Sequence, residues 1–262
     1  MSMEDQIILI DKPAGISSFG VVAKVRGRLK AEFGHKVKVG HTGTLDPFAT
    51  GLLILLSGKM TKKSNEFLKL DKVYEATLKL GYVSTTGDPE GEITRHDQSI
   101  KSTKIEEHDK LYHKNTKAPE DTLSRSVFGD GPNMERPSPV TTGARERSEK
   151  DVSLVLKSFI GKITQTPPKF SAIKINGQRA YKLARAGKDF EIPSRQVEIY
   201  NIEILLYDYP ELKIRVHCSS GTYIRTLAED IGKKLNTGAY LTALRRTKIG
   251  DYDIKDAKQL VL

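Results

Sequence analysis

The apolar residues of this chain are gathered in short runs that are separated by stretches of helical spacing. Residues 7–10 and 52–56 are the longest such runs, and the alternation at 73–80 is typical of a strand with one buried face. Residues 59–70 have helical spacing instead. Because these elements follow no steady strand–helix–strand rhythm, we expect an α+β fold with a mixed sheet rather than a doubly wound parallel one.

Cap and turn residues predict the remaining elements. Ser18 is positioned to cap a basic helix that ends near Leu29. Asn176-Gly177 is a two-residue turn signal inside a strand–turn–helix unit that spans residues 170–185. Further elements are expected at residues 197–207 and 212–218 (strands), 222–235 (helix) and 240–249 (strand).

Residues 97–150 interrupt this pattern. The segment has few large apolar residues, several prolines and glycines, and ten basic against ten acidic side chains. Such a composition buries too little apolar surface to offset the entropy of ordering, so we expect a flexible insertion with one short helix near 105–112. Because the charges of the segment cancel, the rest of the chain carries the whole net charge of +10.

The charge and the cysteine content limit the class of protein. A net charge of +10 outside a neutral segment favours an anionic partner such as RNA. Cys218 is the only cysteine, so no intrachain disulfide can form. The apolar runs are too short to cross a bilayer, and the polar N-terminus does not read as a signal peptide. We therefore expect a cytoplasmic protein that does not contact a membrane.

No cofactor or metal motif is found in the sequence. Residues 51–59 resemble a phosphate-binding loop, but six residues separate the glycines and Met60 stands where Ser or Thr must reach magnesium. The six histidines have no metal-ligand spacing with Cys218. We expect neither a bound metal nor a cofactor.

The most informative segment is residues 40–51, Gly-His-Thr-Gly-Thr-Leu-Asp-Pro-Phe-Ala-Thr-Gly. Its glycines permit unusual backbone angles and close approach of a ligand. Pro47 keeps Asp46 out of the helical region, so the carboxylate is presented on an extended backbone. Such a carboxylate is a candidate nucleophile or base, although a turn aspartate explains the same residue.

This segment resembles the signature of the bacterial tRNA pseudouridine-55 synthases, the TruB family. Further stretches resemble other motifs of the same family in the same order. They are residues 8–18, 72–81, 85–91, 165–187, 218–227 and 238–246. The resemblance covers nearly all of the chain outside residues 97–150. It implies the pseudouridine synthase fold, a mixed and mostly antiparallel sheet flanked by helices, with a thumb-like RNA-binding loop near residues 165–187.

The resemblance also implies a reaction and the residues that carry it. The reaction is isomerisation of the TΨC-loop uridine of tRNA to pseudouridine by base flipping, with Asp46 as the nucleophile. Arg225 would pair with Asp46. Tyr74 would stack on the flipped uracil, and Tyr223 would accept a proton. No cofactor is implied.

Three further residues are implied to bind the substrate or to support the site. Leu244 would line the pocket, His41 would stack into the place that the uridine leaves, and Lys12 would support the floor of the active site. Without the resemblance, Leu244 would be assigned to the core and His41 to a turn. A strand tyrosine such as Tyr74 would be assigned to packing.

Basic residues outside the insertion are candidates for phosphate contacts. Arg245-Arg246, with Lys233, Lys234 and Lys248 nearby in sequence, are either a solvated group or a strip that faces the RNA backbone. The helix that follows Ser18 adds Lys24 and Arg26.

The expected domain is residues 1–250, interrupted at about 97–150 and followed by a short tail, 251–262. Members of the family usually continue into a C-terminal RNA-binding module of the PUA type, which we expect to be absent. We expect a monomer that binds the T-arm stem-loop of tRNA and needs no obligate protein partner. Two other functions stay open: a non-catalytic tRNA-folding factor, and the catalytic subunit of a guide-RNA particle.

Overall fold

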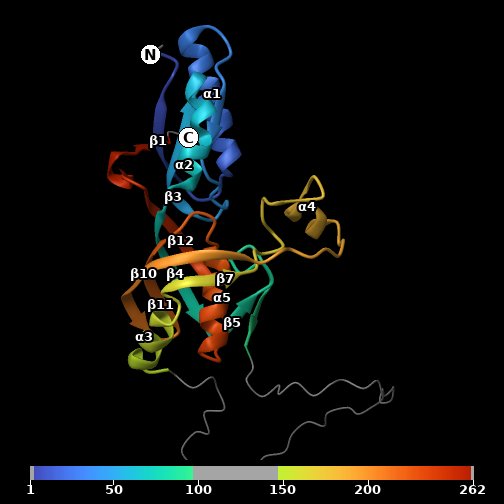
Figure 1. The fold of residues 1–262 in the computed structure, drawn as a ribbon, viewed down its shortest axis with the longest axis vertical. Coiled ribbons are helices and arrows are strands. Elements are labelled where there is room, and N and C mark those ends of the chain that lie inside the picture. Colours follow the sequence, from blue (N-terminus) through green and yellow to red (C-terminus); the bar gives the residue numbers. More distant parts are fainter. Residues whose placement is uncertain (1–2, 97–146, 261–262) are drawn as a thin grey trace, which may run out of the picture. The chain divides into compact units, whose positions relative to one another are not determined.

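A ten-stranded mixed sheet forms the centre of the part of the chain that the structure describes, residues 3–96 and 147–260. Figure 1 shows it in this computed structural model. Its strands are β1 (Ile7–Lys12), β2 (Val39–His41), β3 (Thr50–Ser57), β4 (Lys72–Leu80), β7 (Gly161–Gln165), β10 (Arg195–Asp208), β11 (Glu211–Cys218), β12 (Ala239–Ile249), β13 (Tyr252–Asp253) and β14 (Lys258–Gln259).

The strand order is β14-β1-β3-β12-β4-β11-β10-β7, with β2 added to β3 and β13 added to β12. Two neighbouring pairs are parallel, β1 with β14 and β12 with β3. The other neighbours are antiparallel. The expectation of a mixed and mostly antiparallel sheet is therefore confirmed.

The helices are α1 (Ser18–Phe33), η1 (Gly58–Lys63), α2 (Ser64–Lys69), α3 (Glu149–Lys157), α4 (Ala180–Arg185), α5 (Ile224–Lys234) and η2 (Ile254–Asp256). All of the helices except α4 lie along the main sheet (Figure 1). Two short hairpins stand apart from the main sheet: β5 (Tyr82–Ser84) with β6 (Ile93–Arg95), and β8 (Lys174–Ile175) with β9 (Gln178–Arg179).

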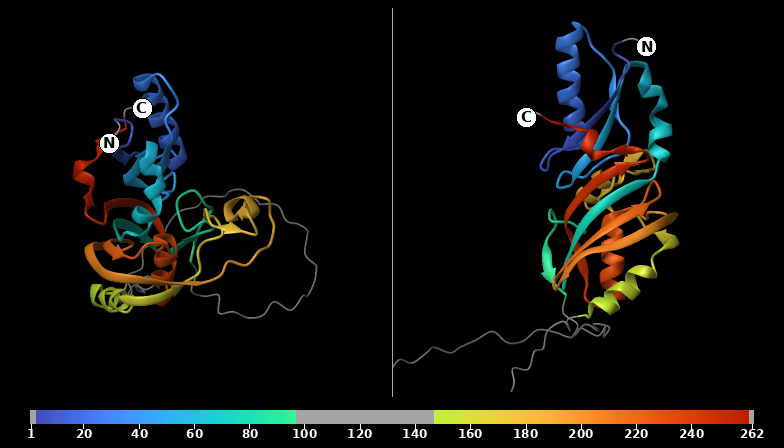
Figure 2. Two further views of the ribbon diagram at one scale, coloured as in Figure 1. Left: turned by 45° about the horizontal axis from the view of Figure 1, so that its top comes forward. Right: turned by 90° about the vertical axis from the view of Figure 1, so that its left-hand side faces the viewer.

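Strand β3 is apolar without alternation because both of its faces are covered. Leu53 and Leu55 pack with the buried valines of α1, whereas Leu52, Ile54 and Leu56 pack with Met60 and Phe67 from η1 and α2. Figure 2 shows α1 and α2 on opposite sides of this part of the sheet. A continuous apolar run of strand length is what such two-sided burial requires.

The N-cap of helix α1 lies one residue before the expected position. Ser17, not Ser18, is the N-cap, and its hydroxyl accepts a hydrogen bond from the Gly20 N–H. The Ser18 side chain is buried and bonds to a distant loop instead. The helix also extends past Leu29 to Phe33, where Gly34 adopts a left-handed conformation and closes the C-terminus.

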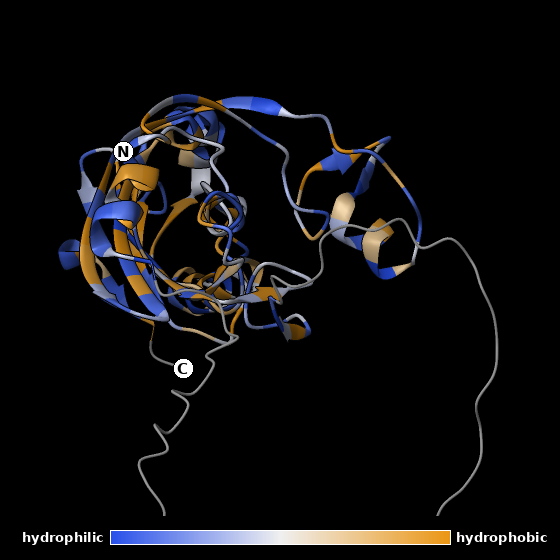
Figure 3. Ribbon diagram, turned by 90° about the horizontal axis from the view of Figure 1, so that it is seen from below, coloured by the Kyte–Doolittle hydropathy of each residue, from blue (hydrophilic) through white to orange (hydrophobic). Residues whose placement is uncertain are grey.

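The other half of the sheet has one buried face. Buried and less buried residues alternate along β4 and β11. Strands in Figure 3 show bands of hydrophobic and hydrophilic colour. The buried side chains pack against Leu227 and Ile231 of α5 and against Val152 and Leu156 of α3. This packing fixes the start of α5 close to the sheet.

The segment between β7 and β10 projects from the sheet and carries the β8–β9 hairpin and α4 (Figure 1). Asn176 and Gly177 both have positive φ, at 47° and 81°, as the two-residue hairpin turn requires. The strand–turn–helix expectation for residues 170–185 is thus confirmed. We call residues 166–194 the thumb segment.

Within the interval 97–150, the structure describes only residues 147–150. The helix predicted at 105–112 lies outside the described residues. Residues 147–150 belong to the folded domain, because Ser148 caps α3 and Arg147 donates to the Leu235 carbonyl at 2.9 Å. After residue 250 the chain returns to the sheet, where β14 pairs with β1. The proposed domain limits stay predictions.

Gly51 offers a direct test of how β3 meets β12. It has φ of +105°, and a Cβ there would lie 2.3 Å from the backbone oxygen of Arg246. We expect Gly51→Ala to lower the free energy of unfolding by at least about 2 kcal/mol, since strain and overlap add. Urea denaturation measures the change.

Gly27 is the matched control, because it lies within α1 and a Cβ there meets nothing within 4 Å. Gly27→Ala should be neutral or stabilise by up to about 1 kcal/mol. Equal effects of the two substitutions would contradict this account of the β3–β12 junction.

Candidate active site

The loop that carries Asp46 is braced on both sides of that residue. Before it, the Ser18 hydroxyl donates to the Leu45 carbonyl at 2.9 Å and accepts from the Leu45 N–H at 2.8 Å. After it, the Pro47 carbonyl accepts from the Gly15 N–H at 2.9 Å and from Lys12 Nζ at 3.2 Å. Asp46 therefore lies between two residues whose backbone positions are fixed.

Lys12 is fully buried and directs its ammonium group at main-chain oxygens. Besides Pro47, it donates to the carbonyls of Pro13 and Ile16, each at 2.8 Å. Burial lowers the pKa of Lys12 to about 8. Lys12 thus contacts the backbone of the Asp46 loop through Pro47, and its supporting role stays a prediction.

Arg225, the second residue of α5, contacts Asp46 directly. Its Nε lies 3.1 Å from Asp46 Oδ2, and its side chain is only 4% exposed. The remaining guanidinium nitrogens bind Asp88 Oδ2 at 3.1 Å and the carbonyls of Thr86 and Phe170 at 3.2 and 2.9 Å. One guanidinium thus connects the Asp46 loop, the β5–β6 connection and the thumb segment.

Asp88 is a buried partner of Arg225 that was not predicted from the sequence. It is 3% exposed and accepts hydrogen bonds from the Thr86 hydroxyl and the Glu90 N–H. Its position in the Thr-Thr-Gly-Asp-Pro stretch was visible in the sequence, but its pairing with a helix about 140 residues away was not.

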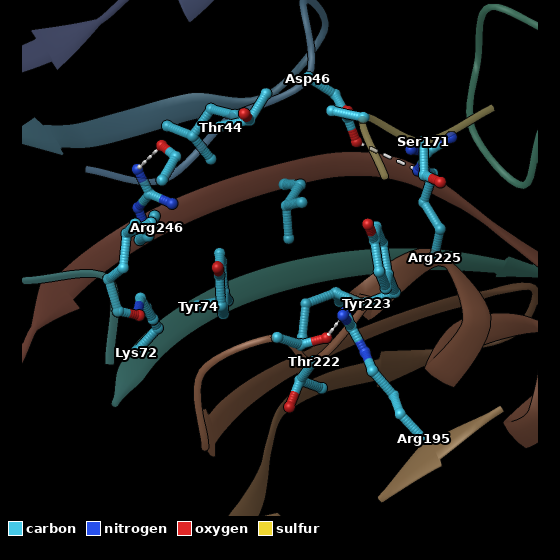
Figure 4. Close-up of a pocket in the computed structure, with 17 residues that line it drawn as sticks. Thr44, Asp46, Lys72, Tyr74, Ser171, Arg195, Thr222, Tyr223, Arg225 and Arg246 are labelled. Carbon is cyan, nitrogen blue, oxygen red and sulfur yellow. Dashed lines mark hydrogen bonds and ion pairs between the residues drawn. The ribbon is translucent and has the colours of Figure 1, made fainter. Parts of the chain in front are cut away.

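A pocket of about 300 Å³ opens beside the Asp46–Arg225 pair. Figure 4 shows Tyr74 and Tyr223 projecting into it, with Asp46 opposite them. Leu244 lines the same pocket from β12, the strand that pairs with the Tyr74-bearing strand β4. Four of the predicted residues, from four separate motifs, therefore meet Arg225 around one cavity.

His41 lies outside this pocket. It lines an adjoining groove of about 730 Å³, together with Phe19 of α1 and Arg179, Tyr181 and Arg185 of the thumb segment. Burial is the main cause that lowers the pKa of His41, and the nearby Arg246 adds to it. Asp46 borders both the groove and the pocket.

Arg245 and Arg246 do not form the phosphate-facing strip that was one of the two interpretations above. Arg246 is 1% exposed and donates to the carbonyls of Leu52 at 2.8 Å and Gly43 at 3.2 Å. Arg245 forms an ion pair with Asp11 at 2.7 Å. Neighbours on a strand face opposite sides of the sheet, so one member of such a pair is expected to point inward.

Further polar side chains that were not predicted line the pocket, among them Lys72, Arg195 and Ser171. Lys72 donates to the Leu68 carbonyl at 2.8 Å, and burial lowers its pKa to about 8. The Arg195 guanidinium lies 4.9 Å from the centre of the Tyr223 ring. Ser171 comes from the thumb segment. Lys72 and Ser171 lie within stretches that resemble family motifs, but no role was predicted for them, and Arg195 lies outside those stretches.

The electrostatic state of Asp46 reflects two opposed effects. Burial raises the pKa of the carboxyl group above its ordinary value, and the positive charge of Arg225 opposes that rise. The Asp46 side chain is 31% exposed and borders the pocket. No group of three His, Cys, Asp or Glu side chains within residues 3–96 and 147–260 is arranged to hold a metal ion.

Comparison with known proteins places this geometry in a family. The model of the TruB family pseudouridylate synthase N-terminal domain matches residues 29–122 and 132–224. The chain belongs to the TruB family of pseudouridylate synthases. The model of the tRNA pseudouridylate synthase B C-terminal domain matches residues 225–261. The N-terminal match enters the interval 97–150 from both sides.

Relatives named tRNA pseudouridine synthase B match nearly the full length of this TruB-family chain. The protein from Flavobacterium johnsoniae is 41% identical over 99% of this chain and 95% of its own length. The protein from Phocaeicola vulgatus is also 41% identical, over 97% of this chain and 89% of its own.

A solved Cbf5–Nop10–Gar1 complex contains a chain with the same fold. That chain is 25% identical with a TM-score of 0.58, and the match covers 97% of this protein but 52% of the Cbf5 complex chain. This protein thus spans about half the length of that chain. No helix within the described residues is long and apolar enough to cross a membrane.

The shifted pKa of Asp46 can be measured in the free protein. In a carbon-13 titration of carboxyl groups, we expect the Asp46 signal to titrate above 3.8, because burial favours the protonated form. Arg225→Gln should move this pKa higher still, since a positive charge that favours the carboxylate is removed. Loss of the signal in Asp46→Asn assigns it.

Asp253 provides an internal control in the same titration. A hydrogen bond from the Lys255 N–H lowers the pKa of Asp253, so its signal should titrate below 3.8. An Asp46 signal at or below that of Asp253 would contradict this description of the site.

Proposed function

We propose that this protein is a tRNA pseudouridine synthase that isomerises the uridine of the TΨC loop. The observation that carries the proposal is the Asp46 carboxylate, held 3.1 Å from a buried guanidinium at the edge of a pocket with two tyrosines. Family membership makes the chain a pseudouridine synthase, an isomerase. The names of the relatives support tRNA as the substrate.

The reaction is chemically balanced within the nucleotide. The bond between uracil N1 and ribose C1′ breaks, the uracil turns, and a new bond joins C5 to C1′. C5 loses its hydrogen as a proton and N1 gains a proton. Because no electrons or groups are exchanged with another molecule, we propose that no cofactor takes part.

Asp46 is the nucleophile in this proposal. It forms a temporary covalent bond, to ribose C1′ or to the uracil ring, and leaves again when C5 bonds to C1′. Arg225 keeps the carboxylate ionised and oriented in a shielded site. Lys12 and Ser18 hold the flanking backbone and do not touch the substrate.

The two tyrosines have separate roles in the proposal. Tyr74 stacks on the flipped uracil, which compensates for the stacking that the base loses and tolerates rotation in the plane of the ring. Leu244 forms an apolar wall of the pocket. Tyr223 accepts the proton that leaves C5. His41, in the adjoining groove, is positioned to fill the space that the uridine vacates.

The groove is the proposed path of the RNA backbone. Arg179 and Arg185 of the thumb segment line it and supply positive charge for phosphates. We propose that the protein acts as a monomer in the cytoplasm and needs no guide RNA or partner subunit. A purified protein that converts a T-arm stem-loop by itself tests this; a requirement for a second subunit would favour the guide-RNA alternative.

Replacing Asp46 tests the proposed chemistry. Asp46→Asn should abolish pseudouridine formation in a T-arm stem-loop, because an amide is a far poorer nucleophile than a carboxylate. RNA affinity should stay within about tenfold, roughly 1.4 kcal/mol. Chromatographic separation of uridine from pseudouridine after digestion measures the product.

Asp230→Asn is the control, since Asp230 lies on α5 and pairs with Lys233 outside the pocket. It should convert RNA at the wild-type rate. Conversion by Asp46→Asn at that rate would refute the proposal. A wild type that refolds tRNA without forming product would favour the folding-factor alternative.

The tyrosines are distinguished by single-turnover rates. Tyr74→Phe keeps the stacking face and should retain activity, whereas Tyr74→Ala should lose about 1–3 kcal/mol of stacking. Tyr223→Phe removes the proposed proton acceptor and should slow the reaction by about 10²–10⁴-fold. Equal and mild effects of the two Phe substitutions would contradict this division of roles.

A further inference from the structure

The pocket and the groove are adjacent and share a border, which we call the throat. Its residues are those that border both cavities: Thr44, Leu45, Asp46, Ser171, Ala172 and Arg225. The nucleophile loop contributes Thr44, Leu45 and Asp46 to the throat, and the thumb segment contributes Ser171 and Ala172. A nucleotide with its base in the pocket and its phosphates in the groove has to cross this border.

Ser171 borders the throat and has a buried hydroxyl without a hydrogen-bond partner among the described residues. The residue is 4% exposed, and its hydroxyl makes no hydrogen bond within residues 3–96 and 147–260. Its backbone is nevertheless held in place. The Ser171 carbonyl accepts from the Tyr181 N–H at 3.0 Å, and the preceding Phe170 carbonyl accepts from Arg225 at 2.9 Å. A buried hydroxyl that has no protein partner and sits on a fixed backbone is available to bind a polar group of the substrate.

The covalent order of a nucleotide determines which of its parts reaches the throat. If the uracil occupies the pocket and the phosphates follow the basic groove, as the proposed function requires, the ribose lies between them. This places C1′ next to Asp46, as the chemistry needs. The ribose is therefore the part of the substrate within reach of Ser171.

We propose that the Ser171 hydroxyl forms a hydrogen bond with the 2′-hydroxyl of the target nucleotide. Both groups can donate and accept, and the 2′-hydroxyl is the free hydroxyl of a ribose inside an RNA chain. This contact makes Ser171 a substrate-binding residue that distinguishes a ribonucleotide from a deoxyribonucleotide at the reacting position. The inference rests on the proposed function, which supplies the orientation of the nucleotide.

The test compares wild type and Ser171→Ala on T-arm stem-loops that carry either uridine or 2′-deoxyuridine at the target position. Wild type should prefer uridine by about three- to tenfold in kcat/KM through this bond. Ser171→Ala should lose that factor on uridine and change little on 2′-deoxyuridine. If deoxyuridine does not react at all, dissociation constants measured in the inactive Asp46→Asn background give the same comparison.

Thr44→Val is the matched control, because Thr44 is an exposed hydroxyl residue of the same throat. It should keep the full preference for uridine. Loss of the preference in Thr44→Val, or an equal loss on both substrates in Ser171→Ala, would overturn the assignment to Ser171.

The melting temperature separates this role from a structural one. Since the hydroxyl has no partner in the free protein, Ser171→Ala should melt at or above the wild-type temperature. A decrease of several degrees would show a structural partner and overturn the inference. Failure of wild type to form pseudouridine would reject the proposed function itself, whereas product with an unchanged preference would reject only the role of Ser171.

Discussion

The site depends on the ion pairs that the buried guanidinium of Arg225 forms. This guanidinium lies between two carboxylates, Asp46 at 3.1 Å and Asp88 at 3.1 Å, and also binds carbonyls from two other segments. A buried arginine is costly unless its charge and its donors are paired. Asp88 supplies a fully buried counter-charge, which leaves the Asp46 carboxylate partly exposed toward the pocket.

The fold holds both partners of the Asp46–Arg225 pair in place. The start of α5 is fixed by packing against the sheet, and the Asp46 loop is fixed by Ser18 and Lys12. Gly51 then lets β3 approach the backbone of Arg246 on β12. Because these contacts join segments that are far apart in the chain, the geometry of Asp46 is a property of the whole domain.

Local patterns in the sequence predicted most of the elements, since strand alternation and turn residues act over short distances. The sheet class, the Asn176-Gly177 turn and the Asp46 loop were all found in this way. The helix cap was assigned to Ser18 rather than to Ser17, because serine is a good cap at either position. What decided between them was a bond from Ser18 to Leu45, 27 residues away.

The composition of the site was less predictable than its position. The family resemblance brought Asp46, Tyr74, Tyr223 and Leu244 together, but burial and pairing decide the state of the other polar residues. Arg246 reads as a surface cation in the sequence and is buried against carbonyls in the fold. The unpaired hydroxyl of Ser171 likewise cannot be recognised before the thumb segment is placed against Arg225.

The central claim is that the contacts of Arg225, and not its charge alone, set the geometry of Asp46. The most direct test uses a T-arm stem-loop whose target uridine is tritiated at C5, and measures the rate at which Arg225→Lys releases the tritium. Each pseudouridine formed displaces that hydrogen, so release reports completed isomerisation. A lysine keeps the positive charge but cannot bind Asp46, Asp88 and two carbonyls together. The account predicts single-turnover release slowed by about 100-fold or more with RNA affinity retained. Release near the wild-type rate would contradict it, because charge alone would then be sufficient.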